Sequence, residues 1–281
     1  MIVRLLWAVV AVFGLLGCAA VPRTIQPDLT QINQLLPADA ILLGEQHDAP
    51  DHQRIHRVVV EALSSQSMLA ALTLEMVSQG QSTESLLSTA SEEQVQAALQ
   101  WNNRGWPWLN YGPAVMAAVR AGVPVMGANL PAAKLREAMA NTRLDTLLSG
   151  PALKAQQQNV RLGHCGLLPE SQISPMTRVQ IARDMTMAET LVQATRAGKT
   201  VLLLTGSSHA DRSLGVPQHL PAQFNAKVVL LHAEDEPDAS KNTRQFDLFW
   251  PARPAPVVDH CAIFAASQGA SEAASAPAKA P

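Results

Sequence analysis

Five short, mainly apolar segments constrain the fold of this chain more than any other feature of its sequence. They span residues 40–43, 69–74, 123–126, 200–204 and 227–231. Nearly continuous apolar runs of this length are typical of strands that are buried on both faces, as in a parallel sheet covered by helices. The sequence therefore predicts a buried, mainly parallel sheet.

The segments between these runs carry apolar residues three and four positions apart, which is the pattern of an amphipathic helix. The spacing and the positions of proline and glycine predict helices over residues 50–63, 112–122 and 174–198. Strands that alternate with helices predict an α/β fold. Residues 80–110 and 131–197 contain more helical sequence than single crossovers need, so we also expect a smaller helical subdomain over roughly residues 131–197.

Size and charge set limits on both the fold and its partners. A chain of 281 residues with 47% hydrophobic content can bury one sizeable core, or one core and a small subdomain. The formal net charge is -2 and only 16% of the residues are charged. Because no basic field is present, nucleic acid is not an expected partner.

The N-terminus has the features of a bacterial lipoprotein signal. Arg4 precedes an apolar run that is too short to span a bilayer comfortably, as in a secretory signal peptide over residues 1–17. The run ends in Leu15-Leu16-Gly17-Cys18, which looks like a lipobox whose cysteine is acylated. The residues after Cys18 are alanines rather than the aspartate of inner-membrane retention. By resemblance to that sorting rule we expect a lipid anchor in the outer membrane, with an uncleaved transmembrane anchor as the alternative.

The chain divides into four expected parts. The signal peptide is followed by a tether over residues 18–36, where prolines discourage an early helix. Residues 37–264 are expected to form the α/β domain with its helical subdomain. Residues 265–281 are rich in Ala, Ser and Pro and are expected to be disordered.

Two cysteines remain after the lipobox, and each follows a histidine. Cys165 lies in Gly163-His164-Cys165, and Cys261 lies in Asp259-His260-Cys261. An exported protein can form disulfides, so the pair favours a single bridge between the middle of the chain and its C-terminal segment. A His/Cys metal site is the alternative, since both residue types are zinc ligands.

Acidic and histidine residues follow three of the predicted strands at the point where each strand ends. Glu45 and His47 follow the first strand, Glu75 follows the second, and His209 follows the fourth. Ligands of open α/β sheets bind outside the carboxyl ends of the strands, and His52 on the next helix would lie beside the same crevice. Ionisable groups are costly to bury without partners, so these residues together predict a functional site.

Tyr111 is the only tyrosine in the chain and lies within Trp106-Pro107-Trp108-Leu109-Asn110-Tyr111-Gly112. Its phenolate is one of the few side-chain oxygens that bind haem iron. An aromatic turn before a helix is the alternative interpretation of this stretch.

These residues resemble a known family. Gly44-Glu45-Gln46-His47, Glu75 and Gly206-Ser207-Ser208-His209 resemble the signature of the Tiki, TraB and erythromycin-esterase relatives. With the Trp106–Pro113 stretch and the lipobox, the chain resembles the ChaN-type haem-binding lipoproteins from about residue 40 to residue 233.

The resemblance implies a parallel sheet with flanking helices, a small helical domain, a link to iron acquisition, and haem bound at a homodimer interface through a tyrosine. Carried over by position, that tyrosine is Tyr111, the axial ligand of the iron. Trp108 would supply an apolar wall, and the strand-end residues would line or buttress the pocket; these are Glu45, His47, His52, Glu75 and His209. We therefore expect a haem-binding protein that holds or passes on haem, and not an enzyme.

Relatives in the wider superfamily include metal-dependent peptidases and an esterase. They imply an alternative in which a divalent metal and the residues Glu45, Glu75 and His209 catalyse hydrolysis. The sequence contains neither an HExxH motif nor a nucleophile elbow.

Overall fold

The computed structural model describes residues 27–233 and 245–266. The expected signal peptide, Cys18 and residues 267–281 of the expected tail lie outside the described residues. Within the described ranges, no helix combines the length and apolar character needed to cross a membrane.

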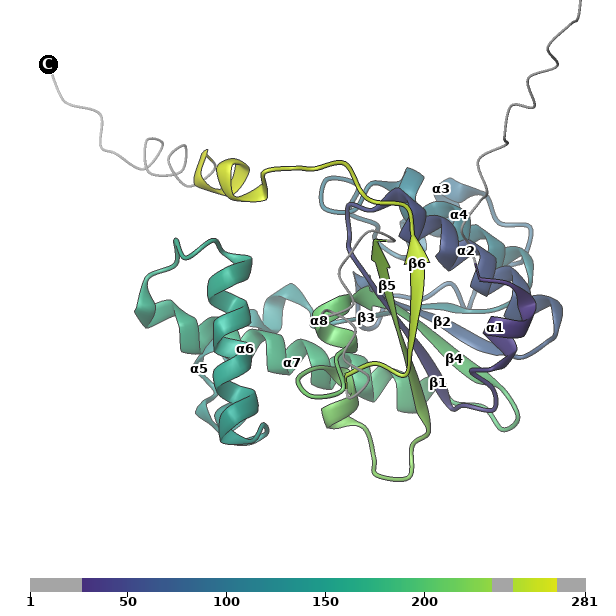
Figure 1. Ribbon diagram of the computed structural model, residues 1–281. Coiled ribbons are helices and arrows are strands. Elements are labelled where there is room, and N and C mark those ends of the chain that lie inside the picture. The colour runs from purple at the N-terminus through teal and green to yellow at the C-terminus, as the bar shows by residue number, and fades with distance from the viewer. Residues whose placement is uncertain (1–26, 234–244, 267–281) are drawn as a thin grey trace, which may run out of the picture.

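A sheet of six parallel strands forms the centre of the fold (Figure 1). The strands are β1 (Ala40–Glu45), β2 (Leu69–Ser78), β3 (Val125–Asn129), β4 (Thr200–Gly206), β5 (Ala226–Ala233) and β6 (Leu248–Ala252). Their order across the sheet is β3-β2-β4-β1-β5-β6. The predicted α/β class and the parallel sheet are confirmed.

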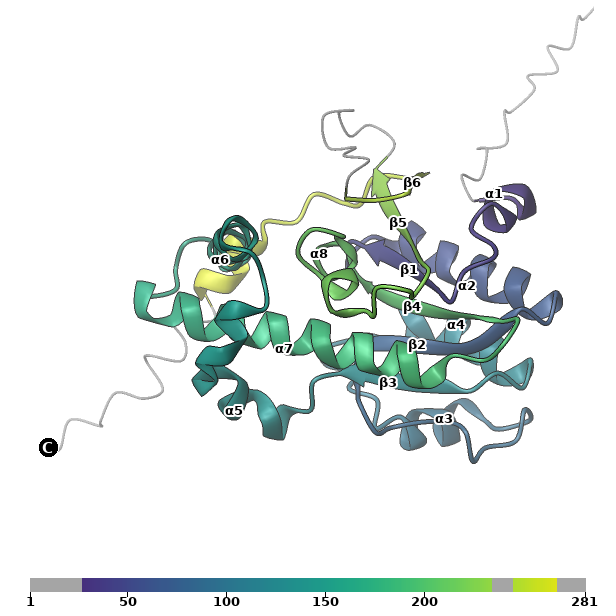
Figure 2. The same ribbon diagram turned by 90° about the horizontal axis from the view of Figure 1, so that it is seen from below.

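Helices cover both faces of this sheet. They are α1 (Leu29–Asn33), α2 (Pro50–Ser65), α3 (Glu92–Ala98), α4 (Trp108–Arg120), α5 (Leu135–Ala140), α6 (Gly150–Gly163), α7 (Glu170–Ala194) and α8 (Ser207–Ala210), with 3-10 turns at Ala132–Lys134, Thr142–Thr146 and Val216–His219. Figure 2 shows α7 on one side of the sheet and α2 and α4 on the other. Every residue of β1 and β4 is buried, which explains why the sequence of these strands shows no polar alternation.

The edge strand β6 was not predicted. Its sequence is Leu248-Phe249-Trp250-Pro251-Ala252, and a proline lowers the expectation of a strand because it cannot donate a backbone hydrogen bond. The position at the edge of the sheet resolves the conflict, because one side of an edge strand needs no donor.

Two predicted helix starts were wrong for the same reason. The helix expected at Gly112-Pro113 begins at Trp108, and the one expected at Ser174-Pro175 begins at Glu170. In both cases an earlier proline, Pro107 or Pro169, occupies the N-cap, and the second proline lies six residues later inside the helix. The rule that proline marks the first turn was applied to the wrong proline of each pair.

Part of the expected tether is packed against the fold. The side chain of Asp28 caps α1 in a capping box with Gln31, and Ile32 and Leu35 are buried in the core cluster that also contains residues of α2. The expected boundary at residue 37 is therefore too late. Burial of the two apolar side chains fixes residues 28–35 to the domain.

The region 131–197 contains α5, α6 and α7, together with a core cluster of its own. This cluster consists of Ala138, Leu144, Leu148, Val179, Ile181 and Ala182, and an ion pair between Arg178 and Asp145 joins two of its elements at 2.7 Å. The apolar face of α7 is narrower than the spacing of its apolar residues indicates, because Met185 and Val192 are 39% and 41% exposed.

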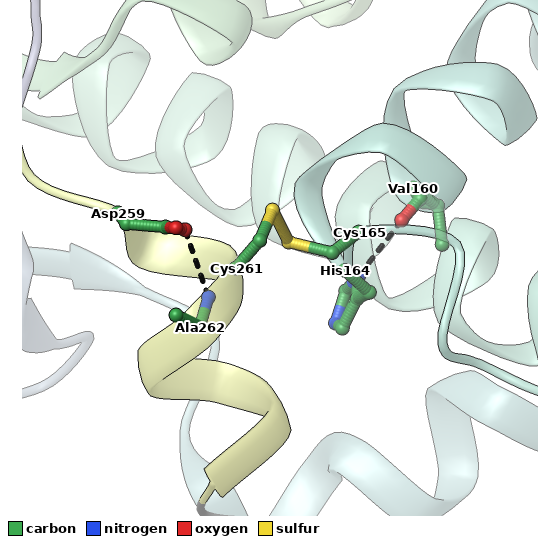
Figure 3. The surroundings of a disulfide bond; sticks show 6 residues. All are labelled: Val160, His164, Cys165, Asp259, Cys261 and Ala262. Carbon is green, nitrogen blue, oxygen red and sulfur yellow. Dashed lines mark hydrogen bonds between the residues drawn. A yellow bond between two sulfur atoms is a disulfide. The ribbon is translucent and has the colours of Figure 1, made fainter.

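Cys165 and Cys261 form a disulfide across 96 residues of sequence. Figure 3 shows the bond between the turn after α6 and a short helical segment at residues 260–266. A cross-link over a loop of this length stabilises a fold by about 4–5 kcal/mol in the chain-entropy model, because it restricts the unfolded chain.

We predict that Leu202→Ala, in the middle of β4, lowers the free energy of unfolding by about 2–5 kcal/mol, because Leu202 is fully buried and its truncation leaves a cavity. Denaturant unfolding followed by circular dichroism measures the change. Leu87→Ala is the matched control, since Leu87 is 77% exposed, and should change the value by no more than about 0.5 kcal/mol. Equal losses in the two variants would contradict the burial that the fold assigns to β4.

Candidate functional site

Glu45 is a buried carboxylate at the end of β1 that is surrounded by polar groups from three elements. Its Oε1 accepts a hydrogen bond from the Tyr111 hydroxyl at 2.6 Å and lies 2.7 Å from Nδ1 of His47. Its Oε2 accepts a bond from the Gln53 amide at 3.1 Å. Nε2 of the fully buried His56 lies 3.5 Å from the same oxygen. A buried carboxylate with this many partners is held in one orientation.

Glu75 is a second buried carboxylate, at the same edge of the sheet. Its Oε2 accepts hydrogen bonds from the Thr205 hydroxyl and the Gly206 backbone amide, both at 2.7 Å. Its Oε1 lies 3.5 Å from Nε2 of His209 and 3.9 Å from Nε2 of His47. Glu75 therefore lies between two imidazoles.

His209 is oriented from its other side by Asp184 of α7. Nδ1 of His209 and Oδ1 of Asp184 are 2.6 Å apart, and Asp184 is fully buried. The sequence analysis did not identify Asp184 as a site residue, although its position could have indicated this. Asp184 lies on the same face of α7 as Ile181 and Ala188, and an acidic residue on that apolar face has to be buried against the sheet.

A glycine makes the connection across the sheet possible. The strand β4 lies between β1 and β2, and Gly206 pairs in register with Glu45. A Cβ atom at Gly206 would lie 2.9 Å from Nε2 of His47, so a side chain here would push the imidazole away. The absence of that side chain lets His47, which follows β1, reach Glu75 on β2.

The result is one chain of polar groups along the carboxyl edge. It runs through Asp184, His209, Glu75, His47, Glu45 and Tyr111, and we call it the polar chain. The structure thus brings together five of the predicted site residues: Glu45, His47, Glu75, His209 and Tyr111. His47 is its most accessible member, with a side chain that is 39% exposed.

The charges of the polar chain are set by burial and by the neighbouring groups. Burial alone would favour a neutral Glu75, but the charges of His209 and His47 and the bonds from Gly206 and Thr205 lower its pKa to about 2. Burial opposes the charged form of His209 as well, yet Glu75 and Asp184 outweigh it and raise the pKa of His209 to about 9. At neutral pH the pair is therefore a carboxylate and an imidazolium.

The pKa values of Asp184 and His47 are also raised, but for different reasons. Burial raises the pKa of Asp184 to about 6, even though the charge of His209 acts in the opposite direction. For His47, burial lowers the pKa, but its contacts with Glu45 and Glu75 outweigh burial and raise it above the ordinary value.

Tyr111 is enclosed and not open to solvent. It is 1% exposed, and the rings of Trp106 and Trp101 lie 5.9 Å and 6.0 Å from its ring. Burial and the adjacent charge of Glu45 raise the pKa of its hydroxyl well above the ordinary value. In this conformation Tyr111 is a neutral hydrogen-bond donor to Glu45, so direct ligation of haem iron requires another conformation of its surroundings.

Two predicted site residues lie apart from the polar chain. His52 was expected to face the crevice, but it is 2% exposed and its Nδ1 accepts a hydrogen bond from the Gln46 backbone amide at 2.9 Å. Burial lowers the pKa of His52 to about 4, so it is a neutral acceptor that supports the loop before it. The indole of Trp108 donates to Glu92 at 2.8 Å and packs on Trp101, not on the strand ends.

The donor groups do not form a metal site. Among residues 27–233 and 245–266, no group of three or more His, Cys, Asp or Glu side chains is placed so that it could hold a metal ion. The predicted divalent-metal alternative gains no support from this geometry.

A groove away from the polar chain has a volume of about 660 Å³. It runs along the solvent side of α2 and α4, and its lining includes Arg57, Trp108, Pro113 and Arg120. No histidine, tyrosine or cysteine lines it, and Met116 is its one lining residue of a type that binds haem iron.

The sequence and the fold are similar to known proteins. The sequence matches the family described as "Haem-binding uptake, Tiki superfamily, ChaN" over residues 31–220. Among solved structures, the chain is similar to ChaN of Campylobacter jejuni in a structure entitled "Cofacial heme binding", with 25% identity, a TM-score of 0.65, and coverage of 80% of this chain and 91% of that one. No match was found among curated proteins.

More distant similarity extends to other solved structures. An erythromycin esterase mutant, EreC H289N, shares 14% identity with a TM-score of 0.45 over 73% of each chain. The type III effector HopBA1 shares 16% identity with a TM-score of 0.41 over 71% of this chain and 79% of that one.

We predict that His209 and His52 titrate far apart, with midpoints near pH 9 and pH 4. Because the pKa of His209 is raised above its ordinary value of 6.5, its contribution to stability is complete below about pH 6.5 and is lost as the pH rises through 9. Histidine NMR signals recorded against pH measure both midpoints. In Asp184→Asn the midpoint of His209 should fall while that of His52 stays in place. Titration of both residues near pH 6.5 would contradict the polar chain.

Proposed function

This chain belongs to the ChaN family of haem-binding uptake proteins in the Tiki superfamily, and from that membership we propose that it binds haem at the carboxyl edge of its sheet, next to Tyr111. The proposal rests most on one observation. The only tyrosine of the chain lies in a cluster of tryptophans with its hydroxyl 2.6 Å from a buried carboxylate.

The residues around Tyr111 fit the chemistry of ferric haem. A phenolate is a hard anionic oxygen, and it stabilises iron(III) as an axial ligand. Ligation requires the phenol to lose its proton, and Oε1 of Glu45 is positioned to accept it. Trp101 and Trp106 supply aromatic surfaces for a flat apolar ligand.

Access to Tyr111 requires Trp106 to move. The residues before it, 102–105, are exposed, whereas Trp106 itself is partly buried and packs edge-on against both Tyr111 and His47. The Trp101 indole donates to the Trp106 carbonyl and the Asn103 amide donates to Oε1 of Gln96, both at 2.8 Å, so hydrogen bonds join this loop to the residues before it. We propose that the haem-bound state displaces the Trp106 side chain and places the porphyrin over Tyr111.

His47 does not fit as the axial ligand. Both of its ring nitrogens face carboxylate oxygens: Nδ1 lies 2.7 Å from Oε1 of Glu45, and Nε2 lies 3.9 Å from Oε1 of Glu75. We propose that His47 borders the haem. Glu75, supported by His209 and Asp184, then fixes the position of the His47 imidazole.

We predict that Tyr111→Phe weakens hemin binding by at least about tenfold, equivalent to about 1.4 kcal/mol, and abolishes the phenolate-to-iron charge-transfer absorption. Titration of the purified protein with hemin, followed in the Soret and visible regions, measures both effects. Phe retains the ring and loses only the hydroxyl, so the packing among the tryptophans is preserved.

His47→Gln is the matched control for this experiment, because it removes the accessible imidazole and leaves the phenol in place. It should retain the charge-transfer band. If Tyr111→Phe keeps the spectrum of the unaltered protein and His47→Gln loses it, His47 is the ligand and the assignment to Tyr111 is wrong.

We propose further that the protein is attached to the outer membrane through acylated Cys18 and serves haem uptake by holding or passing on haem. The relative from Campylobacter jejuni is described as binding haem cofacially. Two haems stacked face to face would be supplied by two copies of this chain, so we propose a homodimer in the haem-bound state.

We predict that Cys18→Ala releases the protein from the membrane, because a chain without the acyl groups has lost the hydrophobic anchor. Full-length protein and variant are expressed in a bacterial host, and membranes are separated on a density gradient. The unaltered protein should sediment with outer-membrane markers and carry the mass of an acylated cysteine. An equal distribution of the two proteins would refute the anchor.

A further inference from the structure

Residues 253–266 follow β6 and form a segment that we call the strap. It runs extended from Arg253 to Asp259 and ends in the helical segment 260–266. Figures 1 and 2 show it leaving the tip of β6 and reaching the helices of the subdomain beside α6. Most of its residues are exposed, including the apolar Val257 and Ile263 at 103% and 61%.

The strap contacts the loop that carries His47. Asp51, in the first turn of α2, accepts hydrogen bonds from the Arg253 backbone amide at 3.0 Å and from Nε of Arg253 at 3.2 Å. Nε2 of His260 lies 2.7 Å from Oδ2 of Asp48. Asp48 is the neighbour of His47 in sequence, so residues 46–51, which we call the site loop, are joined to the strap at two points.

The other end of the strap is joined to the helical subdomain. The disulfide links Cys261 to Cys165 in the turn after α6 (Figure 3). The ring of Phe264 lies edge-on to that of His164, with the ring centroids 5.7 Å apart. The strap thus connects the site loop to the subdomain that supplies Asp184 through α7.

The disulfide is the strongest of these attachments. Ion pairs between exposed side chains contribute little to stability, and both the Arg253 and the His260 side chains are more than half exposed. The exposed valine and isoleucine show that apolar burial does not hold the strap either. Without the covalent bond, the remaining contacts are too weak to keep an exposed segment of this length ordered.

We propose that the strap is a redox-controlled latch on the haem site. With the disulfide intact it holds the site loop against the helical subdomain and retains haem; reduction frees the strap and the site loop and speeds haem release. A dithiol supplies two electrons and two protons: the Cys165–Cys261 bond breaks, two thiols form, and the dithiol is oxidised to its own disulfide. The part of this inference that concerns haem retention and release, which we call the haem arm, rests on the proposed function.

The first test measures hemin release. Hemin-loaded protein is mixed with excess apomyoglobin, and the transfer of hemin is followed in the Soret region with and without dithiothreitol. We expect reduction to raise the release rate of the unaltered protein at least about tenfold, equivalent to about 1.4 kcal/mol. The double variant Cys165→Ser with Cys261→Ser should release hemin at the fast rate in both conditions, which also controls for direct action of the reductant on iron.

The second test does not depend on haem. Hydrogen exchange of the haem-free protein, oxidised and reduced, reports on the amides of residues 46–51. Faster exchange after reduction supports the latch, with His260→Ala as a control that removes the contact with Asp48 and leaves the disulfide in place. Unchanged exchange at the site loop overturns the latch whether or not hemin binds, whereas absence of hemin binding with faster exchange overturns only the haem arm and the proposed function.

Discussion

The ionised Glu75 between His209 and His47 is the interaction on which the carboxyl edge of this protein depends. Glu45 ends β1 and Glu75 lies within β2, two strands separated only by β4, and each buried carboxylate would cost several kcal/mol if it lacked partners. His47 lies between the two carboxylates. The imidazolium of His209, which Asp184 fixes, compensates Glu75 from its other side. The positions of β1, β2, α7 and α8 are therefore coupled through charge as well as through apolar packing.

Much of the fold could be predicted because its determinants are local. The buried strands β1 to β5 appear as apolar runs, and the converging residues Glu45, His47, Glu75 and His209 follow from the rule that parallel strands end at one edge. The prediction errors concern features of secondary structure that depend on tertiary contacts. The edge position of β6 permits Pro251, and the choice between two prolines at the start of α4 depends on what the preceding turn packs against.

The role of Tyr111 also depends on tertiary contacts that the sequence does not reveal. The sequence marks it as unusual, but only the three-dimensional structure shows that its hydroxyl donates to Glu45 and that Trp106 covers it. Likewise, Asp184 lies 25 residues from His209 in sequence and meets it only because α7 crosses the sheet face beside α8. The structure brings the predicted strand residues together, whereas the groups that orient them were not predicted, since those come from helices whose rotation the sequence does not specify.

Gly206 gives the site a property that can be read directly from other sequences. The central strand β4 ends in Gly206 between β1, which ends in Glu45, and β2, which carries Glu75, and the glycine leaves a gap one side chain wide. Through that gap His47, which follows β1, reaches Glu75. The three strands then carry parts of one pattern and not independent motifs. A related chain with both acids and the histidine but a larger residue at the central position would hold two separate half-sites, and sequence comparison can sort such chains by that single position.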